Sequence, residues 1–371
     1  MLTTNLTAST PGRICLFGEH LDYLGLPVIA AAIDRRVALT ARPDPIDRRF
    51  RIRLPDIDQQ VNISFDGGRL PYPHDRDYLR SSVNVLLQEG FTFSRGVEAT
   101  VRGTIPINAG ASSSSALIVS WLNVLSQLAD VPRHLPPMTL AELAYRAEVL
   151  EFGEPGGMMD HFATAVGNVI YLESQRPDGT SAITLETLTP QLGTFVLGDS
   201  REPKDTIGIL RRVKLGMLDV VQRIRQSRPD FSLHTAALTD VPEFKDQLSK
   251  DEYILLKGTL ANRDLLREAR TLLQTPSANV RAFDGRLGTL LTEHQANLRD
   301  AQRISTPKID RMLEAALSAG ALGGKINGSG GGGSMFVYAP TGADAVADAI
   351  DRVGGKAYVV RVAEGTTLTT D

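Results

Sequence analysis

Residues 105–116 read Ile-Pro-Ile-Asn-Ala-Gly-Ala-Ser-Ser-Ser-Ser-Ala, and residues 117–128 follow as a strongly apolar segment. That segment is apolar on most faces, which predicts a buried helix. The start of a helix leaves backbone N–H groups unpaired and carries the positive end of the dipole, and small residues let an anion approach them. The serine hydroxyls can add hydrogen bonds or reach Mg²⁺. We therefore expect a phosphate site here, with a simple serine-rich N-cap as the alternative.

A second glycine-rich segment covers residues 323–334, Gly-Gly-Lys-Ile-Asn-Gly-Ser-Gly-Gly-Gly-Gly-Ser. Its composition alone would suit a flexible linker. However, a predicted amphipathic helix over 308–319 precedes it and a predicted strand over 335–338 follows it. Residues 328–333 match the G-x-G-x-x-G spacing, but a dinucleotide site requires a helix after the glycines, so that interpretation fails. A Walker A motif is also absent from the sequence.

Two acidic segments are further candidates. Residues 18–23 read Gly-Glu-His-Leu-Asp-Tyr and cluster Glu19, His20 and Asp22 on one turn, which could bind sugar hydroxyls, hold a metal, or be a solvated loop. Asp160 lies among glycine and apolar residues, where a carboxylate needs a charge partner or a role. Its alternative is the N-cap of a helix over 161–166. The six histidines show no metal-ligand spacing.

Composition limits the function classes. A chain of 371 residues is too long for one compact core and suits two lobes. Forty basic and 43 acidic residues argue against a nucleic-acid-binding surface. A single cysteine, Cys15, excludes an intramolecular disulfide. We found no stretch long enough to span a membrane and no signal-peptide pattern, so we expect a cytoplasmic protein.

The periodicity predicts an α+β fold. Strands are expected over 13–17, 26–40, 50–54, 169–172 and 194–197. Helices are expected over 78–88 and from a capping box at 139–142 to about 152. The second half is expected to be mainly helical, over 207–224, 255–273, 280–302 and 308–319, with strands at 335–338 and 357–362. Strands and helices segregate instead of alternating. We place the lobe boundary near residue 190, which gives lobes 1–190 and 191–371.

Four of these segments, in this order, resemble the GHMP kinase superfamily, and most closely galactokinase and related sugar kinases. Residues 11–23 resemble the galactokinase signature, and residues 106–115 resemble the superfamily phosphate loop P-x-x-x-G-L-S-S-S-A. Residues 157–160 resemble the galactokinase G-I-M-D segment, and residues 327–334 resemble the C-terminal T-G-x-G-x-G-G motif. The resemblance spans residues 11–338, nearly the whole chain.

The resemblance implies a two-lobed fold, with a ribosomal S5-like N-terminal lobe that binds ATP and a ferredoxin-like C-terminal lobe that completes the substrate site. It implies an ATP- and Mg²⁺-dependent kinase that phosphorylates a hydroxyl of a monosaccharide or sugar derivative by direct in-line transfer. The site residues it implies are Asp160 and Arg13 for catalysis; Gly110, Ser112, Ser113 and Ser114 for the ATP phosphates; Ser114 and Glu148 for the metal; Glu19, His20, Asp22 and Gly157 for the substrate; and Gly328, Gly330 and Gly332 for the active-site loop.

The sequence departs from the galactokinase pattern. Ala111 and Ser115 replace the usual Leu and Ala of the phosphate loop, and Leu21 and Leu24 replace the usual Thr and Asn. Residues 199–206 hold no tyrosine equivalent to the galactokinase tyrosine, which puts galactose in doubt and leaves the sugar open. Arg201 and Lys204 in the same segment could contact an anionic substrate. Alternatives are a mevalonate- or homoserine-type kinase and a non-catalytic sugar sensor. We expect a monomer or homodimer that binds ATP and a sugar, and no nucleic acid or membrane.

Overall fold

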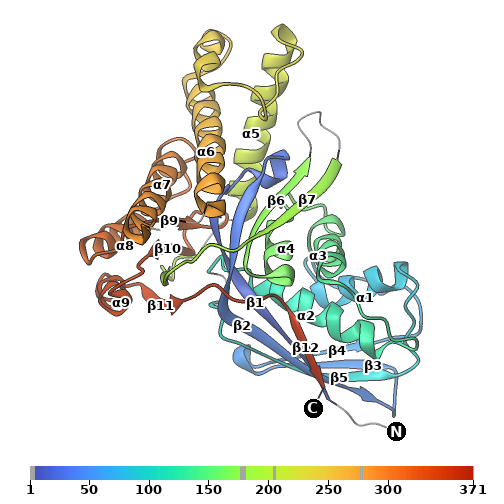
Figure 1. Cartoon of the computed structure of the whole chain (residues 1–371). Coiled ribbons are helices and arrows are strands. Elements are labelled where there is room, and N and C mark those ends of the chain that lie inside the picture. The colour runs from blue at the N-terminus through green and yellow to red at the C-terminus, as the bar shows by residue number, and fades with distance from the viewer. Residues whose placement is uncertain are drawn as a thin grey trace.

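The computed structural model describes residues 5–107, 109–175, 181–203, 206–275, 277 and 279–370. Figure 1 shows two β-sheets side by side, each with its own helices, and a pair of long helices that extends away from both. The expected α+β fold is confirmed. No helix among the described residues is both long and apolar enough to cross a membrane.

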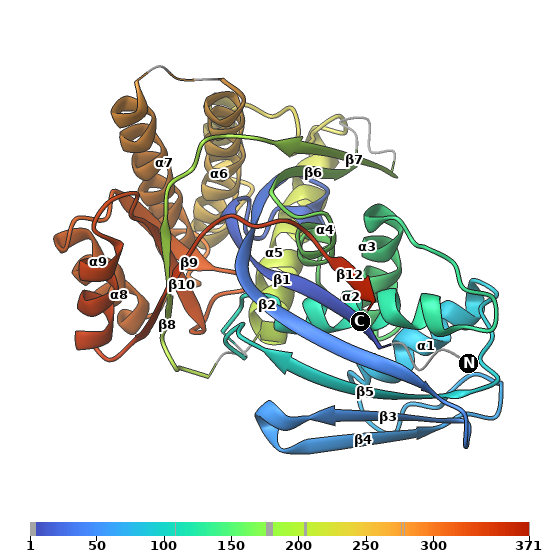
Figure 2. The same cartoon turned by 60° about the horizontal axis from the view of Figure 1, so that its bottom comes forward.

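The larger sheet is mostly antiparallel and follows the order β12-β1-β2-β5-β3-β4, with β6 paired to β2 and β7 to β6. Only the β3–β5 pair among its described strands is parallel. Helices α1 to α4 cover one face of this sheet (Figure 2). The elements are β1 (Leu6–Phe17), β2 (Val28–Asp44), β3 (Arg49–Leu54), β4 (Gln59–Ser64), β5 (Gly96–Gly103), β6 (Val169–Gln175), β7 (Ser181–Leu188), β12 (Thr367–Thr370), α1 (Tyr78–Gln88), α2 (Ser113–Leu128), α3 (Pro137–Tyr145) and α4 (Met159–Val166).

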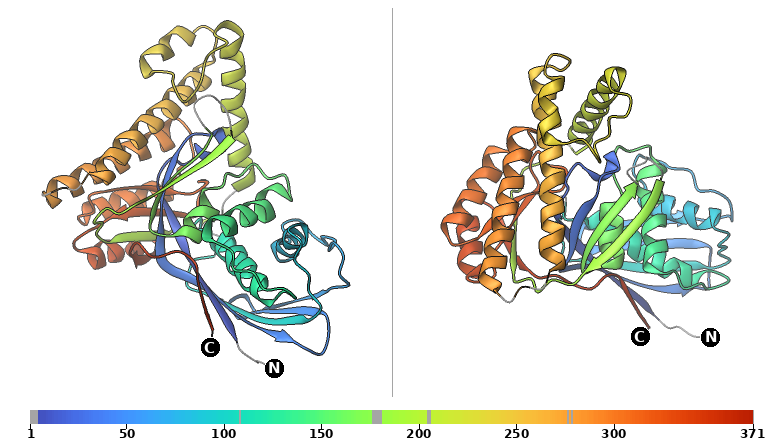
Figure 3. Two further views of the ribbon diagram at one scale, coloured as in Figure 1. Left: turned by 45° about the vertical axis from the view of Figure 1, so that its right-hand side comes forward. Right: turned by 45° about the horizontal axis from the view of Figure 1, so that its top comes forward.

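The smaller sheet is antiparallel, in the order β11-β8-β10-β9. Helices α8 and α9 pack on it, and α7 runs along β9. Both views of Figure 3 show α5 and α6 as an arm that projects beyond the sheets. The elements are β8 (Phe195–Asp199), β9 (Gly323–Asn327), β10 (Ser334–Tyr338), β11 (Lys356–Val360), α5 (Thr206–Ser227), α6 (Lys250–Gln274), α7 (Val280–Asp300), α8 (Pro307–Ser318) and α9 (Ala343–Arg352).

The first and last described strands lie side by side (Figure 1), because β12 pairs with β1 in the larger sheet. The chain changes sheets between β7, which ends at Leu188, and β8, which begins at Phe195. The division into lobes 1–190 and 191–371 stays a prediction.

Helix α2 is buried as predicted: Trp121 and Leu122 are fully inaccessible. It begins at Ser113, earlier than the expected residue 117, so the serines form its first turn. The predicted capping box at 139–142 is wrong. Helix α3 begins at Pro137 and has no side-chain cap, because the fixed φ of proline already suits the first helical turn.

The glycine-rich segment begins as a strand, because residues 323–327 form the edge strand β9. The close approach of β10 to Gly324 explains why β9 needs a small residue at this position. A β-carbon at Gly324 would lie 2.4 Å from the carbonyl oxygen of Phe336 on the neighbouring strand. The strands β4, β5, β7, β9 and β12 were not predicted.

Candidate active site

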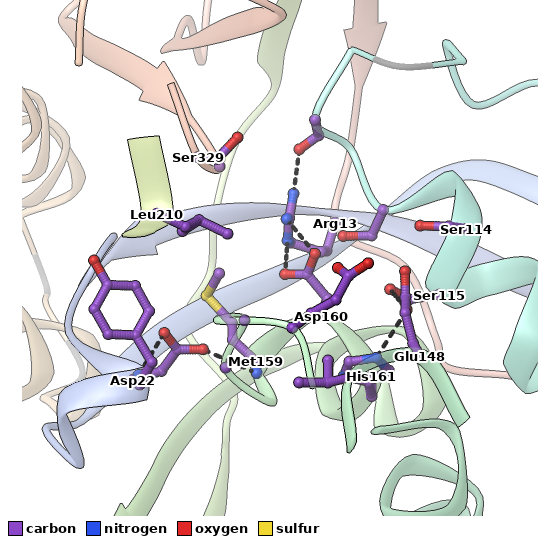
Figure 4. Close-up of a pocket in the computed structure, with 18 of the residues that line it drawn as sticks. Arg13, Asp22, Ser114, Ser115, Glu148, Met159, Asp160, His161, Leu210 and Ser329 are labelled. Atoms are coloured by element: carbon purple, nitrogen blue, oxygen red, sulfur yellow. Dashed lines mark hydrogen bonds and ion pairs between the residues drawn. The ribbon is translucent and has the colours of Figure 1, made fainter. Parts of the chain in front are cut away.

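The predicted site residues gather around one cleft of about 250 Å³. Figure 4 shows that side chains from β1, α2 and α4 and from the loop after β9 converge on it. Twelve of the predicted residues line the cleft: Arg13, Glu19, His20, Asp22, Gly110, Ser112, Ser113, Ser114, Glu148, Gly157, Asp160 and Gly328. Gly330 and Gly332 are absent from its lining.

The centre of the cleft is an ion pair between Arg13 and Asp160 (Figure 4). Arg13 is buried in β1 and donates from Nε to Asp160 Oδ1 at 2.8 Å and from Nη2 to Oδ2 at 2.7 Å. Its Nη1 donates to the carbonyl oxygen of Gly110 in the phosphate loop. One guanidinium therefore connects the expected phosphate site with the expected catalytic carboxylate, 147 residues further along the chain.

Asp160 lies in the first turn of α4, which begins at Met159, so the N-cap interpretation is wrong. Its side chain stays 31% exposed, toward the cleft. Burial raises the pKa of Asp160, but the charge and hydrogen bonds of Arg13 outweigh it and hold that pKa below its ordinary value. The carboxylate is therefore ionised at neutral pH and can accept a hydrogen bond from a hydroxyl group.

The phosphate loop reaches α2 through Ser112, whose backbone is left-handed with φ of 62°. Ser112 precedes the first residue of α2, but its hydroxyl makes no capping hydrogen bond to the helix, so the alternative of a simple serine cap is not borne out at this residue. The first-turn N–H groups of α2 therefore receive no hydrogen bond from Ser112, and Ser113 and Ser114 of that turn line the cleft. Such a helix start favours an anion.

Glu148 lies in a π-helical turn, Arg146–Leu150, behind this loop. Its Oε2 accepts a hydrogen bond from Ser115 Oγ at 2.7 Å and lies 2.8 Å from His161 Nε2. Burial raises the pKa of Glu148, but hydrogen bonding from His161 and the charge of that imidazole outweigh it, so the pKa is lowered. An ionised carboxylate beside the Ser114 hydroxyl is the oxygen-donor set that Mg²⁺ takes when nucleotide phosphates supply further ligands.

No cluster of three or more acidic, histidine or cysteine side chains suited to a metal occurs among the described residues. Ser114 and Glu148 as ligands of a nucleotide-bound Mg²⁺ stay a prediction. The ion would neutralise phosphate charge.

The turn after β1 supplies the other side of the cleft. His20 has a left-handed backbone, and its Nδ1 lies 2.6 Å from Tyr23 Oη while its Nε2 lies 3.0 Å from the carbonyl oxygen of Ser329. Burial lowers the pKa of His20 to about 4, so its imidazole is neutral at physiological pH. The turn is thereby fixed to the glycine-rich loop of the smaller sheet.

Asp22 faces the same cleft. It accepts hydrogen bonds from the backbone N–H of Tyr23 at 2.8 Å and of Met159 at 3.3 Å. Burial, and then repulsion from Asp160, raises the pKa of Asp22 to about 6. A β-carbon at Gly157 would lie 1.9 Å from Asp22 Oδ2, so any residue larger than glycine would clash with the Asp22 carboxylate in this position.

Glu19 differs from its neighbours because its carboxylate is paired inside the protein. Its side chain is 1% exposed and forms an ion pair with Lys325 of β9, which is fully buried. The pair connects the turn after β1 to the smaller sheet. A role for Glu19 as a substrate contact stays a prediction.

The glycine-rich loop reaches the site through its first residues. Asn327 accepts from the backbone N–H of Cys15 at 2.9 Å and donates to the carbonyl oxygen of Gly110 at 2.9 Å. The next residue, Gly328, has φ of 77°, and its β-carbon would lie 3.1 Å from that same oxygen. Gly330 and Gly332 instead face Ile304 and the Glu202–Pro203 backbone, so the loop turns away from the cleft after Ser329.

Several cleft residues were not predicted: Tyr23, Arg76, Tyr78, Glu154, His161, Leu210 and Ser329. His161 adjoins Asp160 and could have been found as a carboxylate partner, but Arg76 and Leu210 come from distant segments without any motif. Arg201 is exposed and absent from the cleft lining, and Lys204 lies outside the described residues.

Comparison with known families agrees with this geometry. Residues 77–168 match the GHMP kinases N terminal domain, and residues 280–356 match the GHMP kinases C terminal model. Residues 3–43 match the galactokinase galactose-binding signature. The chain belongs to the GHMP kinase superfamily. The expected family is confirmed.

As a GHMP kinase, the protein is a phosphotransferase that acts on an alcohol group. Members of this superfamily use ATP as the phosphate donor, generally with Mg²⁺.

The relatives of this GHMP kinase include two substrate classes. A mevalonate kinase of Thermococcus sibiricus is 28% identical over 363 residues, covering 96% of this chain and 95% of that protein. A galactokinase of Actinobacillus succinogenes is also 28% identical, over 342 residues that cover 90% of this chain and 85% of that protein. The crystal structure of Lactococcus lactis galactokinase with galactose superposes with a TM-score of 0.81 at 22% identity, covering 98% of this chain and 95% of that one. Similarity to these relatives does not choose between the two substrate classes.

Proposed function

We propose that this GHMP kinase transfers the γ-phosphoryl group of ATP to a hydroxyl of a monosaccharide or sugar derivative. One observation carries the proposal. The segment that matches the galactose-binding signature contributes His20 and Asp22 to the cleft that holds Asp160 and Arg13.

On the donor side, the start of α2 and the serines at 112–114 would bind the ATP phosphates. Backbone N–H groups at a helix start favour negative charge without having to reorganise during the reaction. Ser114 and Glu148 would hold the Mg²⁺ ion. Because phosphoryl transfer depends mainly on alignment and charge neutralisation, these groups supply what the donor needs.

On the acceptor side, the Asp160 carboxylate would accept the hydrogen bond of the attacking hydroxyl and orient it. The hydroxyl oxygen then bonds to the γ-phosphorus, the bond from that phosphorus to the ADP oxygen breaks, and the hydroxyl proton passes to Asp160. Arg13 stabilises the negative charge that spreads over the transferring group, and it keeps Asp160 ionised beforehand.

A polyhydroxyl acceptor suits the other groups around Asp160. The Asp22 carboxylate, the phenol of Tyr23 and the imidazole of His20 all line the cleft. Neighbouring hydroxyls of a sugar can each meet one of these groups, as acceptors or donors. The mevalonate kinases among the relatives make a non-sugar alcohol the second candidate. A non-catalytic sensor is disfavoured, because the carboxylate of Asp160 and the serine loop are both in place.

ADP release from ATP and Mg²⁺ tests the proposal, with hexoses, pentoses, deoxy sugars, uronic acids, sugar phosphates and mevalonate as acceptors. We expect turnover with at least one sugar and little or none with mevalonate. Mass spectrometry of the product shows whether one phosphoryl group has been added to the sugar. Turnover with mevalonate alone would refute the sugar kinase in favour of the second candidate.

A further inference from the structure

A second compartment adjoins the cleft. Asp22, Tyr23, Gly156 and Gly157 line both spaces. The second space measures about 650 Å³ against about 250 Å³ for the first. The two spaces therefore meet at these four residues, and an acceptor bound at Asp160 would have to extend past Asp22 to reach the larger one.

Lys214 of α5 is the one cation among the described residues that line this second compartment. Helix α5 passes directly over the turn Asp22–Leu24, so it brings Lys214 next to the acceptor side of the site. The side chain is half-buried, and its Nζ lies 5.4 Å from the ring centroid of Tyr23.

The ammonium group of Lys214 forms few polar interactions with the described residues. It donates one long hydrogen bond, 3.4 Å, to the carbonyl oxygen of Pro155. Within the described part of the chain, no carboxylate forms an ion pair with it at 4.0 Å or less. An ammonium group has three donors and is costly to bury without an opposite charge. Burial accordingly lowers the pKa of Lys214, and the charge of Asp22 only partly offsets this.

The surroundings of Lys214 can accommodate an anion. Tyr145 and Ser174 bring hydroxyl donors to the same compartment. Glu142 also lines it, but this side chain is exposed, so water screens its charge. Asp22 is held by the backbone N–H groups of Tyr23 and Met159 at the wall between the two spaces.

We infer that Lys214 binds an anionic substituent of the acceptor, a carboxylate or a phosphate, in the second compartment. This inference rests on the proposed function and narrows its substrate class to anionic sugars. The hydroxyl to be phosphorylated lies at Asp160, and the anionic group of the same molecule lies beyond Asp22. Binding of a charged partner by a half-buried ammonium forms a charge-assisted hydrogen bond, which is stronger than a neutral one.

The test compares one sugar series, a neutral hexose with its uronic acid and its monophosphate, on the wild type and on Lys214→Met. Methionine keeps an unbranched apolar side chain over the Tyr23 ring and removes the charge. We expect the wild type to favour one anionic sugar by about tenfold or more in kcat/KM, the value of one charge-assisted contact. Lys214→Met should remove that preference by raising the KM of the anionic sugar, and its kcat/KM for the neutral sugar should stay within about twofold of the wild-type value.

Lys257→Met, at an exposed position on α6, is the matched control and should keep the preference. Raising the salt concentration should increase the KM of the anionic sugar for the wild type and have little effect on Lys214→Met. Whether the uronic acid or the sugar phosphate is preferred distinguishes a carboxylate from a phosphate.

The outcomes separate the two proposals. Turnover of the neutral sugar with no anionic preference overturns the role of Lys214 and leaves the sugar kinase intact. Equal loss of activity on neutral and anionic sugars in Lys214→Met shows that the lysine only packs α5 against Tyr23. Turnover with mevalonate but with no sugar overturns the proposed function and the inference with it.

Discussion

Replacing Asp160 with asparagine tests the proposed chemistry most directly. The amide has nearly the shape of the carboxylate but no charge. Arg13 donates to both carboxylate oxygens, at 2.8 and 2.7 Å, whereas an amide offers one oxygen and one NH₂ group. One of the two guanidinium hydrogen bonds therefore loses its acceptor, and the buried Arg13 keeps a charge without a counterion.

The two consequences differ in size. Loss of the group that orients the hydroxyl and takes its proton is expected to lower kcat by about 10²–10⁴-fold, or roughly 3–5 kcal/mol of transition-state stabilisation. Loss of one charge-assisted hydrogen bond costs about 1.5–3 kcal/mol of stability when both partners are buried. Because the Asp160 side chain is 31% exposed, solvent screening puts the expected loss at the lower end of that range. Catalysis should therefore suffer more than folding.

The assay measures ADP release with the preferred acceptor, ATP-analogue affinity by titration, and thermal unfolding. Asp264→Asn is the matched control. Asp264 also pairs with a buried arginine, Arg263, which donates from Nε at 2.8 Å. The side chains of Arg263 and Asp264 are 2% and 36% exposed, close to the 4% and 31% of Arg13 and Asp160. The control also removes the counterion of a buried arginine and should keep its kcat, and both variants should bind the ATP analogue. A kcat for Asp160→Asn within about threefold of the wild type would refute the reasoning, as would an equal kcat loss in the control.

Four further predictions concern the surroundings of this pair. In Gly157→Ala the new β-carbon would lie 1.9 Å from Asp22 Oδ2, so steady-state kinetics should show a higher KM for the acceptor and an unchanged KM for ATP. In the control Gly156→Ala the nearest contact of the β-carbon is 3.4 Å, so both KM values should equal those of the wild type. Because the pKa of Asp22 is raised to about 6, acceptor kcat/KM should fall as pH drops through 6, and Asp22→Asn should lose that limb of the pH profile; an unchanged limb would assign it to another group. Asn327→Ala removes two hydrogen bonds to buried backbone and should lower the free energy of unfolding by about 1–3 kcal/mol in a denaturant titration, with a higher ATP KM. Glu148→Gln should raise the Mg²⁺ concentration needed for half-maximal activity by about tenfold or more, and an unaltered Mg²⁺ titration would place the metal elsewhere.

The interactions that join distant segments follow a common pattern. Asn327 and Lys325 in β9, and Ser329 just after it, each contact a residue of β1 or of the turn that follows β1. The smaller sheet thus supplies few groups to the reaction itself and holds the acceptor turn against the phosphate loop. Loss of any of these contacts should disturb acceptor binding more than the chemistry of the bound complex.

Much of the fold class could be predicted from local patterns. The apolar run after the serines identified α2, because a helix with no polar face must be buried. Residues 78–88 were predicted as a helix with the bounds it has. Strands such as β5 and β12 were missed, because pairing partners decide whether such short segments become strands.

The sequence by itself determined which chemical groups this protein has and where the proposed phosphate site begins. A serine run before a buried helix creates that site from neighbouring residues alone, so local physical chemistry suffices to find it. Only the tertiary structure decided how these groups combine. Arg13 meets Asp160 across 147 positions, Lys325 meets Glu19 across 306, and Lys214 reaches the wall formed by Asp22 only because α5 passes over the turn after β1. Such contacts depend on sheet register and helix packing, which bring together residues that share no local pattern.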